Sequence, residues 1–203
     1  MTRTAAGMFL AVLLTMGCGG ITSPYMVRPQ SPPAVMIEPN SATVFFVRPS
    51  DYGGGMKNII IDERGRFLGE CWGQTYFVVK VPPGEHLFIS WGEATPAIRA
   101  TLNPGMVYFV EVGITMGVWT ARSRLLAMGP QRKNWDKIPQ WLAESAPLVP
   151  NEAAGQAYLA ERRQDVQELI QKGMASYAGY DAEGIQQRTL LPTDGVTSPL
   201  PPR

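Results

Sequence analysis

Side chains suited to acid–base or nucleophilic catalysis are scarce in this chain, which has one histidine among 203 residues. His86 is therefore the only possible imidazole base, and Ser90 follows it four residues later. In a β-strand these side chains would share a face but lie about 13 Å apart at ~3.3 Å per residue, too far for a nucleophile and its base. No Gly-x-Ser-x-Gly motif singles out another serine. We therefore predict that the protein is not an enzyme and has no catalytic residues.

Metal, phosphate and cofactor sites are not indicated either. The chain has two cysteines and one histidine, too few ligands for a Cys/His zinc site. Asp62 and Glu63 are adjacent, so in a strand they would point to opposite faces, and we interpret them as solvated turn charges. No Asp-x-Asp-x-Asp calcium loop occurs, and the glycine run 53–55 lacks the following lysine and Ser or Thr of a phosphate-binding loop. We predict no metal and no cofactor.

Cys18 is the residue for which the sequence predicts a modification. It follows an apolar run, residues 5–14, which comes after the cation Arg3 and is too short to cross a membrane as a helix. This arrangement resembles a bacterial lipoprotein signal, in which the chain is cut before a cysteine whose thiol is acylated. By that resemblance residues 1–17 are removed and Cys18 becomes the lipidated N-terminus. The alternative is an ordinary cleavage nearby that releases a soluble periplasmic or secreted protein.

Lipidation would place the protein at the cell envelope, where the lipid anchor would bind it to the membrane. Gly19 is not the aspartate that retains lipoproteins at the inner membrane in some bacteria, so we expect the periplasmic face of the outer membrane. Each buried methylene of an acyl chain contributes ~0.8 kcal/mol, so multiple acylation would anchor the chain stably. Cys71 would then be the remaining thiol, and we expect it to be buried and inert. Without acylation, a Cys18–Cys71 disulfide is the alternative.

The composition is that of a globular protein without a nucleic-acid-binding surface. The chain is 45% hydrophobic and 17% charged, with 18 Lys plus Arg against 17 Asp plus Glu. Removal of residues 1–17 takes Arg3 away and leaves the mature chain with zero net charge. Because nucleic-acid binding needs a basic surface, we predict no nucleic-acid partner.

Turn signals divide residues 41–128 into short strands. Glycine and proline recur at close to the spacing of a sandwich or barrel. The runs between them are rich in β-branched and aromatic residues. These runs are residues 43–47, 58–62, 75–81, 86–91, 97–102, 106–112 and 118–128. We expect a mainly β fold, an antiparallel seven-stranded Ig-like β-sandwich, in which the turn at residues 63–66 closes a hairpin with Gly65 at positive φ.

The flanking segments have different patterns. Prolines crowd residues 19–40, which predicts a semi-extended tether of roughly 60–70 Å at about 3.1 Å per residue. Asn151 is a suitable N-cap for one amphipathic helix that reaches about Tyr177. Its apolar stripe comprises Leu159, Arg163, Val166, Leu169, Ile170, Gly173 and Tyr177. The stripe either packs on the sandwich or binds a partner.

These patterns divide the chain into five parts. The expected parts are a lipoprotein signal peptide at 1–17, a lipid anchor and Pro-rich tether at 18–40, a β-sandwich domain at 41–128, a helical extension at 129–179 and a disordered tail at 180–203.

The strand–turn–strand unit at residues 75–91, with the turn Pro82-Pro83-Gly84, is the most specific piece of the 41–128 region. Further pieces are residues 42–49, 67–69 and 104–109. Together they resemble a bacterial family of exported domains, domain of unknown function 2846, and more loosely the PEGA-type surface β-sandwich modules. The resemblance implies an exported β-sandwich, often on a lipoprotein, and implies no known activity.

Tryptophans offer one further function. The five are Trp72, Trp91, Trp119, Trp135 and Trp141. In an exposed row they could stack on sugar rings, whereas buried they would fill the core or hold the helices, which we expect. We therefore predict a non-enzymatic envelope lipoprotein whose sandwich and helix contact other envelope proteins. The alternative is a cell-envelope glycan- or peptide-binding module.

Overall fold

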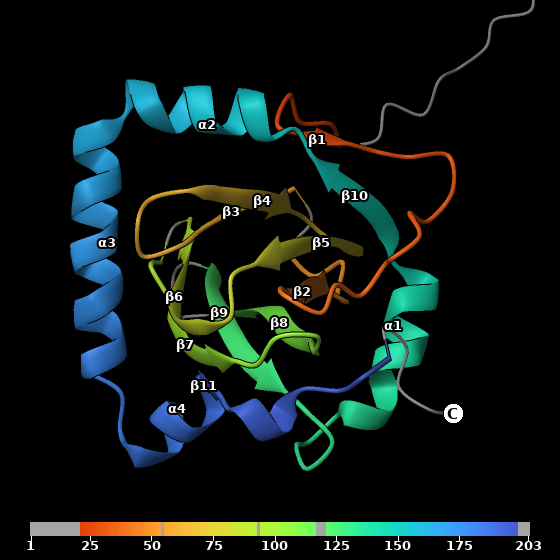
Figure 1. Cartoon of the computed structure of the whole chain (residues 1–203). Coiled ribbons are helices and arrows are strands. Elements are labelled where there is room, and N and C mark those ends of the chain that lie inside the picture. The colour runs from red at the N-terminus through yellow and green to blue at the C-terminus, as the bar shows by residue number, and fades with distance from the viewer. Residues whose placement is uncertain (1–20, 54, 93, 117–120, 199–203) are drawn as a thin grey trace, which may run out of the picture.

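The computed structural model describes residues 21–53, 55–92, 94–116 and 121–198 (Figure 1). This part of the chain contains eleven strands, four α-helices and two 3-10 helices. The strands are β1 (Met26–Val27), β2 (Ala42–Arg48), β3 (Asn58–Ile61), β4 (Phe67–Cys71), β5 (Thr75–Val81), β6 (Gly84–Trp91), β7 (Ala97–Leu102), β8 (Val107–Met116), β9 (Ala121–Met128), β10 (Ala146–Pro150) and β11 (Thr189–Leu190). The helices are η1 (Trp135–Lys137), α1 (Ile138–Glu144), α2 (Glu152–Glu161), α3 (Arg163–Ala178), α4 (Ala182–Gln187) and η2 (Pro192–Asp194).

The strands form two sheets that face each other across a shared hydrophobic core. The six-stranded sheet has the order β1-β10-β5-β2-β8-β9, and the five-stranded sheet has the order β11-β7-β6-β3-β4. Apolar side chains of the two sheets meet between them. The ring of Phe46 in β2 packs edge-to-face on the ring of Phe88 in β6, with 5.4 Å between the centroids. The prediction of a mainly β fold is therefore confirmed.

The sheets are mixed, so the expected antiparallel seven-stranded sandwich is wrong. β2 pairs in parallel with β8, β10 with β5 and β11 with β7. Of the strands that lie between β2 and β8 in the chain, β3, β4, β6 and β7 belong to the other sheet. The chain then returns to the six-stranded sheet as β8, which pairs with β2. The extra strands β1, β10 and β11 come from outside residues 41–128 and extend the sheet edges.

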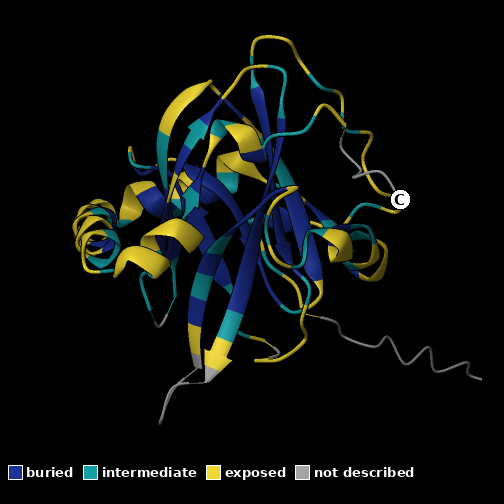
Figure 2. Ribbon diagram, turned by 90° about the horizontal axis from the view of Figure 1, so that it is seen from below, coloured by how far each residue is buried: buried dark blue, intermediate teal, exposed yellow. Residues whose placement is uncertain are grey.

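Both outer faces of this two-sheet body are covered. α2 and α3 pack on the five-stranded sheet, whereas Ile138 of α1 packs with Phe45 and Phe109 on the six-stranded sheet. All seven residues of β2 are buried, as expected of a strand in a sheet covered on both faces. Figure 2 shows the result, with buried strands inside and helices whose outward faces are exposed.

The expected single helix from Asn151 is two helices. Asn151 is the N-cap as predicted, because its side chain accepts a hydrogen bond from the Ala154 amide. Arg162, with φ −118° and ψ 35°, interrupts the helix, and the chain turns a corner between α2 and α3 (Figure 1). After this corner Val166 returns to the sheet, whereas Arg163, predicted in the stripe, is exposed. The apolar stripe thus packs on the protein's own sheet.

The segment expected to be a disordered tail is folded as far as residue 198. It contains α4, β11 and η2, and residues 199–203 lie outside the described part. Leu190 is fully buried in the core, and Val196 forms an isolated bridge with Val107 of β8. The sequence pattern missed these contacts because Leu190 and Val196 are isolated apolar residues, without the periodic repeat that predicts a strand or a helix. The expected helical extension likewise contains a strand, β10.

Residues 21–40 lie along the outside of the body and do not extend from it as the expected tether would (Figure 1). β1 pairs with β10, and Tyr25 packs on Tyr158 of α2 with 4.8 Å between ring centroids. Val35 and Ile37 pack against the apolar cluster beneath α1. The prolines keep the segment extended, but its apolar side chains dock it. In the described part of the chain, none of the helices is long and apolar enough to span a membrane.

Candidate functional site

A pocket of about 400 Å³ lies over β8 and β9, on the outer face of the six-stranded sheet. Its floor includes Glu111 of β8 with Arg124, Leu126 and Met128 of β9. Its walls are residues 131–134, which follow β9, and the end of α4 at Gln186 and Gln187. This size falls within the range of about 300–1,000 Å³ that is usual for ligand pockets.

The pocket floor carries an ion pair, Glu111 with Arg124. Gly113 is opposite Arg124 in the β8–β9 register, so Glu111 is the diagonal neighbour of Arg124 on the same face. Arg124 Nη2 lies 3.4 Å from Glu111 Oε1, and the side chains are 39% and 8% exposed. Arg124 Nε is buried without a hydrogen-bond partner. This N–H is therefore an unused donor that is enclosed beside Gly113.

Gly113 makes this arrangement possible. A β-carbon at Gly113 would lie 2.5 Å from Arg124 Nε and 3.0 Å from Glu111 Oε1. The absence of a side chain lets the guanidinium group lie across the strand beside the carboxylate. Any larger residue at this position would displace Arg124 from the pocket floor.

Arg132 fixes one wall of the pocket. Its Nε and Nη2 donate to the two carboxylate oxygens of Asp194 at 2.8 and 2.7 Å. Nη2 also donates to the Thr189 carbonyl at 2.6 Å, and Nη1 donates to the Gln186 carbonyl at 2.8 Å. A guanidinium group has five N–H donors, so this one is almost fully used. Arg132 therefore holds the C-terminal segment on the body and is not available to a ligand.

The remaining polar groups of the pocket are one lysine and several side-chain amides. Lys133 is an exposed cation, and Gln131, Asn134 and the two glutamines of α4 offer amide donors and acceptors. None of the lining residues is a histidine, serine or cysteine. Among the residues that the structure describes, no group of three His, Cys, Asp or Glu is placed to hold a metal ion.

His86 and Ser90, the pair considered for catalysis, have separate structural contacts. His86 Nε2 lies 2.8 Å from the Pro82 carbonyl, and Nδ1 lies 3.5 Å from a carboxylate oxygen of Glu63. Ser90 is fully buried, and its hydroxyl accepts a hydrogen bond from Asn58 at 3.1 Å. The structure does not bring the histidine and the serine together.

The acidic turn is more ordered than solvated charges would be. Asp62 is buried, and its Oδ1 accepts from the amides of Arg64 and Arg66 at 3.0 and 2.8 Å. Gly65 has a φ of 75° between them, as predicted for the hairpin turn. The interpretation of Asp62 as a solvated charge is therefore wrong. This carboxylate holds the turn between β3 and β4.

Of the two cysteines, only Cys71 lies within the described residues. It is a free thiol and is fully buried, as predicted. Burial in the apolar interior raises its pKa to about 12, which suppresses the reactive thiolate form. Cys18, the predicted lipidation residue, lies outside the described residues.

The tryptophans do not form an exposed row in the described part. Trp72 is 3% exposed. Trp91, Trp135 and Trp141 are half-buried and pack against the apolar clusters. Trp119 lies outside the described residues. The expectation that tryptophans fill the core or hold the helices is confirmed for these four.

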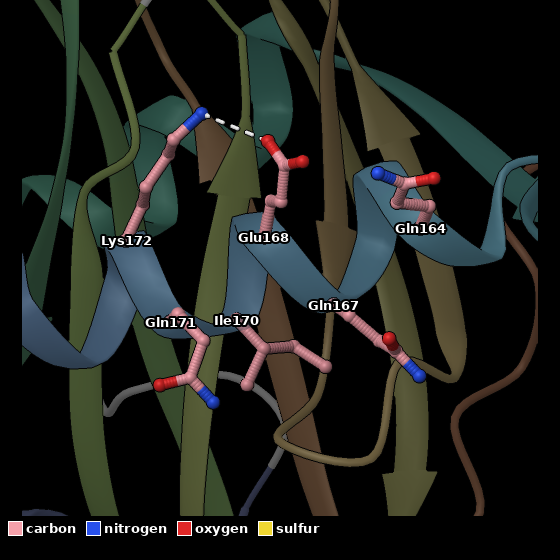
Figure 3. Close-up of a pocket in the computed structure, with 6 residues that line it drawn as sticks. All are labelled: Gln164, Gln167, Glu168, Ile170, Gln171 and Lys172. Carbon is pink, nitrogen blue, oxygen red and sulfur yellow. Dashed lines mark ion pairs between the residues drawn. The ribbon is translucent and has the colours of Figure 1, made fainter.

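A second hollow, of about 650 Å³, follows the exposed side of α3 (Figure 3). Its lining residues are Gln164, Gln167, Glu168, Ile170, Gln171 and Lys172. Glu168 and Lys172 form an ion pair, 3.6 Å between Oε2 and Nζ, on one side of the hollow. Because one helix supplies every lining residue, this is an open surface and not an enclosed site.

Comparison of the chain with protein-family models, with curated proteins and with solved structures found no match.

Proposed function

We propose that this chain is a non-enzymatic, exported lipoprotein of the bacterial cell envelope, anchored through Cys18 at the periplasmic face of the outer membrane. Its two-sheet body would then be an elaborated relative of the β-sandwich modules that residues 41–128 resemble. The observation that carries the proposal is the small number of residues between Cys18 and the first contacts with the folded body. Lys57 Nζ donates to the Thr22 carbonyl at 2.6 Å, and Ser23 forms a bridge with Met26.

Anchoring at Cys18 would hold the body against the membrane. Thr22 is four residues beyond Cys18, and four residues span at most about 14 Å. The lipid chains of an acylated Cys18 enter the bilayer, so the surface around residues 21–27 would lie beside the lipid headgroups. A body held this close to the bilayer should have a surface that can contact lipid headgroups.

The surface beside the first described residues has that character. Exposed apolar side chains gather there: Val27 is 54% exposed, Met36 72% and Val149 37%. Val27 is paired with Val149 across β1 and β10, and Met36 and Val149 line one shallow groove of about 230 Å³. Arg28 adds an exposed cation next to Val27. Apolar side chains beside a cation favour a membrane interface. We call Val27, Met36 and Val149 the apolar patch.

The experiment that tests the anchor is intact-mass analysis with cell fractionation in the native host. The wild type should start at Cys18, carry added acyl mass and fractionate with membranes, whereas Cys18→Ala should lose both the acyl mass and membrane retention. Cys71→Ala is the matched control, because it removes the buried thiol and should leave the anchor intact. An unmodified wild-type chain in the soluble fraction would contradict the proposal and favour a diffusible protein.

Contact with other envelope proteins is a second candidate function, and the outward face of α3 favours it. This face carries the open hollow of Figure 3 and an exposed methionine, Met174 at 51% exposure. Deletion of the helices would uncover their sheet, so the test should leave the fold intact. A photo-crosslinking residue at Gln171 should capture an envelope protein that the same residue at Glu144 of α1 does not. Equal capture from both positions would contradict this role.

A further inference from the structure

A hollow of about 210 Å³ lies beside β1, where the first described residues meet the body. It is lined by residues 21–23, Met26 and Arg28 of the N-terminal segment and by Trp72 and Leu148 of the body. None of these lining residues is acidic. An open hollow of this kind can take a small anionic group such as a phosphate, provided that cations are placed to receive it.

Two cations meet at this hollow. Arg28 lines it and is exposed. Lys57 contacts two of the lining residues, because its Nζ donates to the Thr22 carbonyl at 2.6 Å and lies 5.7 Å from the centroid of the Trp72 ring. In the part of the chain that the structure describes, neither cation is ion-paired with a carboxylate. An ammonium group has three N–H donors and a guanidinium group five, so both side chains keep donors for an anion.

The hollow adjoins both the apolar patch and the predicted anchor. Val27 of the apolar patch directly precedes Arg28. Ile21, which lines the hollow, is itself 37% exposed. Thr22 is four residues beyond Cys18, and four residues span at most about 14 Å. An anchored chain would therefore hold both cations near the phosphate groups of the bilayer, with exposed apolar side chains beside them.

Local charge, and not the charge of the whole molecule, would then select the lipid. After removal of residues 1–17 the chain has 17 basic and 17 acidic side chains, so its net charge is zero. A neutral molecule gains little from a distant anionic surface, because salt screens charges beyond a Debye length. Cations held at the membrane surface, in contrast, are attracted by anionic lipids one by one.

We propose that Arg28 and Lys57, at the hollow beside Trp72, bind the phosphate group of an anionic membrane phospholipid. We call these two cations and the hollow the headgroup site. The inference rests on the proposed function, since it needs a membrane beside β1, and it adds the class of lipid that the body contacts.

Vesicle binding by the unacylated chain tests the headgroup site apart from the anchor. The mature chain, residues 18–203 with Cys18→Ala, is mixed with vesicles of phosphatidylcholine alone or with vesicles of phosphatidylcholine and phosphatidylglycerol. Co-sedimentation measures the partition coefficient for each. It should be about twentyfold higher for the anionic vesicles, because each of two cations at an anionic surface contributes about fivefold. This preference should shrink as salt is added.

Variants locate the site. Arg28→Gln and Lys57→Gln should each reduce the preference about fivefold, the double variant should abolish it, and Lys57→Arg should keep it. Arg122→Gln and Lys133→Gln are the matched controls, because both are exposed cations that do not line this hollow, and they should leave the preference unchanged. Val27→Ser should weaken binding to both kinds of vesicle and leave their ratio unchanged, since it removes apolar contact alone.

Four results would overturn the proposal. They are equal partition into the two kinds of vesicle, a preference that survives in the double variant, an equal loss of preference in Arg122→Gln, and no binding at up to about 10 mM lipid. Displacement of the chain from anionic vesicles by an equal concentration of glycerol phosphate would replace the lipid with a soluble phosphate ester. The chain used here carries no acyl group, so failure of the headgroup site is distinguishable from failure of the anchor, which the mass at Cys18 decides.

Discussion

Arg48 shows how much of this fold can depend on one buried side chain. It is 1% exposed, and its guanidinium group donates to the carbonyls of Tyr52 and Met56 and to Asn58 Oδ1. Burial lowers the pKa of Arg48 below its usual value. The cation therefore bears a desolvation cost, which its bonds to the loop after β2 offset. The arginine at the end of this strand thus has a structural explanation.

We predict that Arg48→Met lowers the free energy of unfolding by about 2 kcal/mol, because carbonyl groups of the loop lose their donors. Urea unfolding followed by circular dichroism measures the change. Arg122→Met, a substitution of the same size at an exposed arginine, should change stability by less than about 0.5 kcal/mol. Equal effects of the two substitutions would show that Arg48 does not support the loop.

The Cys71 thiol should be unreactive until the protein unfolds. With a pKa of about 12, about one thiol in ten thousand is ionised at pH 8, against roughly a quarter of unfolded thiols with a pKa near 8.5. In the Cys18→Ala variant, where Cys71 is the one thiol left, a chromogenic disulfide reagent should react about a thousandfold more slowly with native protein than with protein in urea. Rapid reaction in the absence of urea would contradict the burial of this thiol.

The same shift in pKa has a consequence for stability. Between about pH 8.5, near the usual pKa of an unfolded thiol, and about pH 12, the pKa of the buried Cys71, the unfolded thiol loses its proton while the native thiol keeps it. The free energy of unfolding therefore falls as pH rises through this window. Buried tyrosines with raised pKa, such as Tyr76 and Tyr108, act in the same direction. The difference between wild type and Cys71→Ala isolates the contribution of the cysteine.

At the scale of elements, two glycines decide how closely the helices approach the five-stranded sheet. A β-carbon at Gly155 of α2 would lie 2.2 Å from the ring of Phe67, and one at Gly173 of α3 would lie 2.9 Å from Ile89. Phe67 is buried in a packed interior and has little room to move. Both helices therefore depend on the absence of a side chain at one position.

We predict that Gly155→Ala lowers the free energy of unfolding by about 2 kcal/mol through overpacking, although alanine favours helices by roughly 1 kcal/mol over glycine. Ala157→Ser, at an exposed position of α2, is the control and should change stability by less than about 0.5 kcal/mol. Chemical denaturation measures both. A stabilised Gly155→Ala variant would show that helix propensity outweighs the contact with Phe67.

Several elements were predictable because local pattern determines them. β5 and β7 have the predicted bounds, and Asn151 caps a helix as predicted, since alternation and capping are read within a few residues. β10 was missed because Pro147 and Pro150 argue against a strand, yet it pairs in parallel with β5. The break at Arg162 was missed because it depends on how the two helices pack on the sheet. A local sequence pattern carries no information about that packing.

The candidate pocket was missed for a similar reason. Glu111 and Arg124 are charged residues within apolar strand runs, and that signal could have marked both as facing something other than the core. Their pairing, however, follows from the β8–β9 register. Arg132 and Asp194 are 62 residues apart, and no spacing rule joins them. Tertiary register, and not composition, creates this site.

At the scale of the whole molecule, the apolar patch and the pocket over β8 and β9 lie at opposite ends of one sheet. The six-stranded sheet begins with β1 and β10, which carry the apolar patch, and ends with β9, which borders the pocket. If the β1 edge rests on the membrane, four strands separate β1 from β9. At about 4.8 Å between strands this separation is roughly 20 Å or more. An anchored body would thus hold the pocket over β8 and β9 away from the lipid.

This orientation yields the last prediction, which compares two single-cysteine labels with matched exposure. Val27 in the apolar patch is 54% exposed and Met174 on α3 is 51% exposed, while the buried Cys71 does not compete for the reagent. In lipid vesicles, an environment-sensitive fluorophore on acylated Val27→Cys should brighten and be quenched by quenchers within the bilayer, because four residues beyond Cys18 the chain is already fixed to the body. The same fluorophore on Met174→Cys should remain quenched by water-soluble agents.

Similar lipid quenching at both positions would mean that the body tumbles freely on its anchor. Lipid quenching at Met174 alone would place the helices, and not the β1 edge, on the membrane.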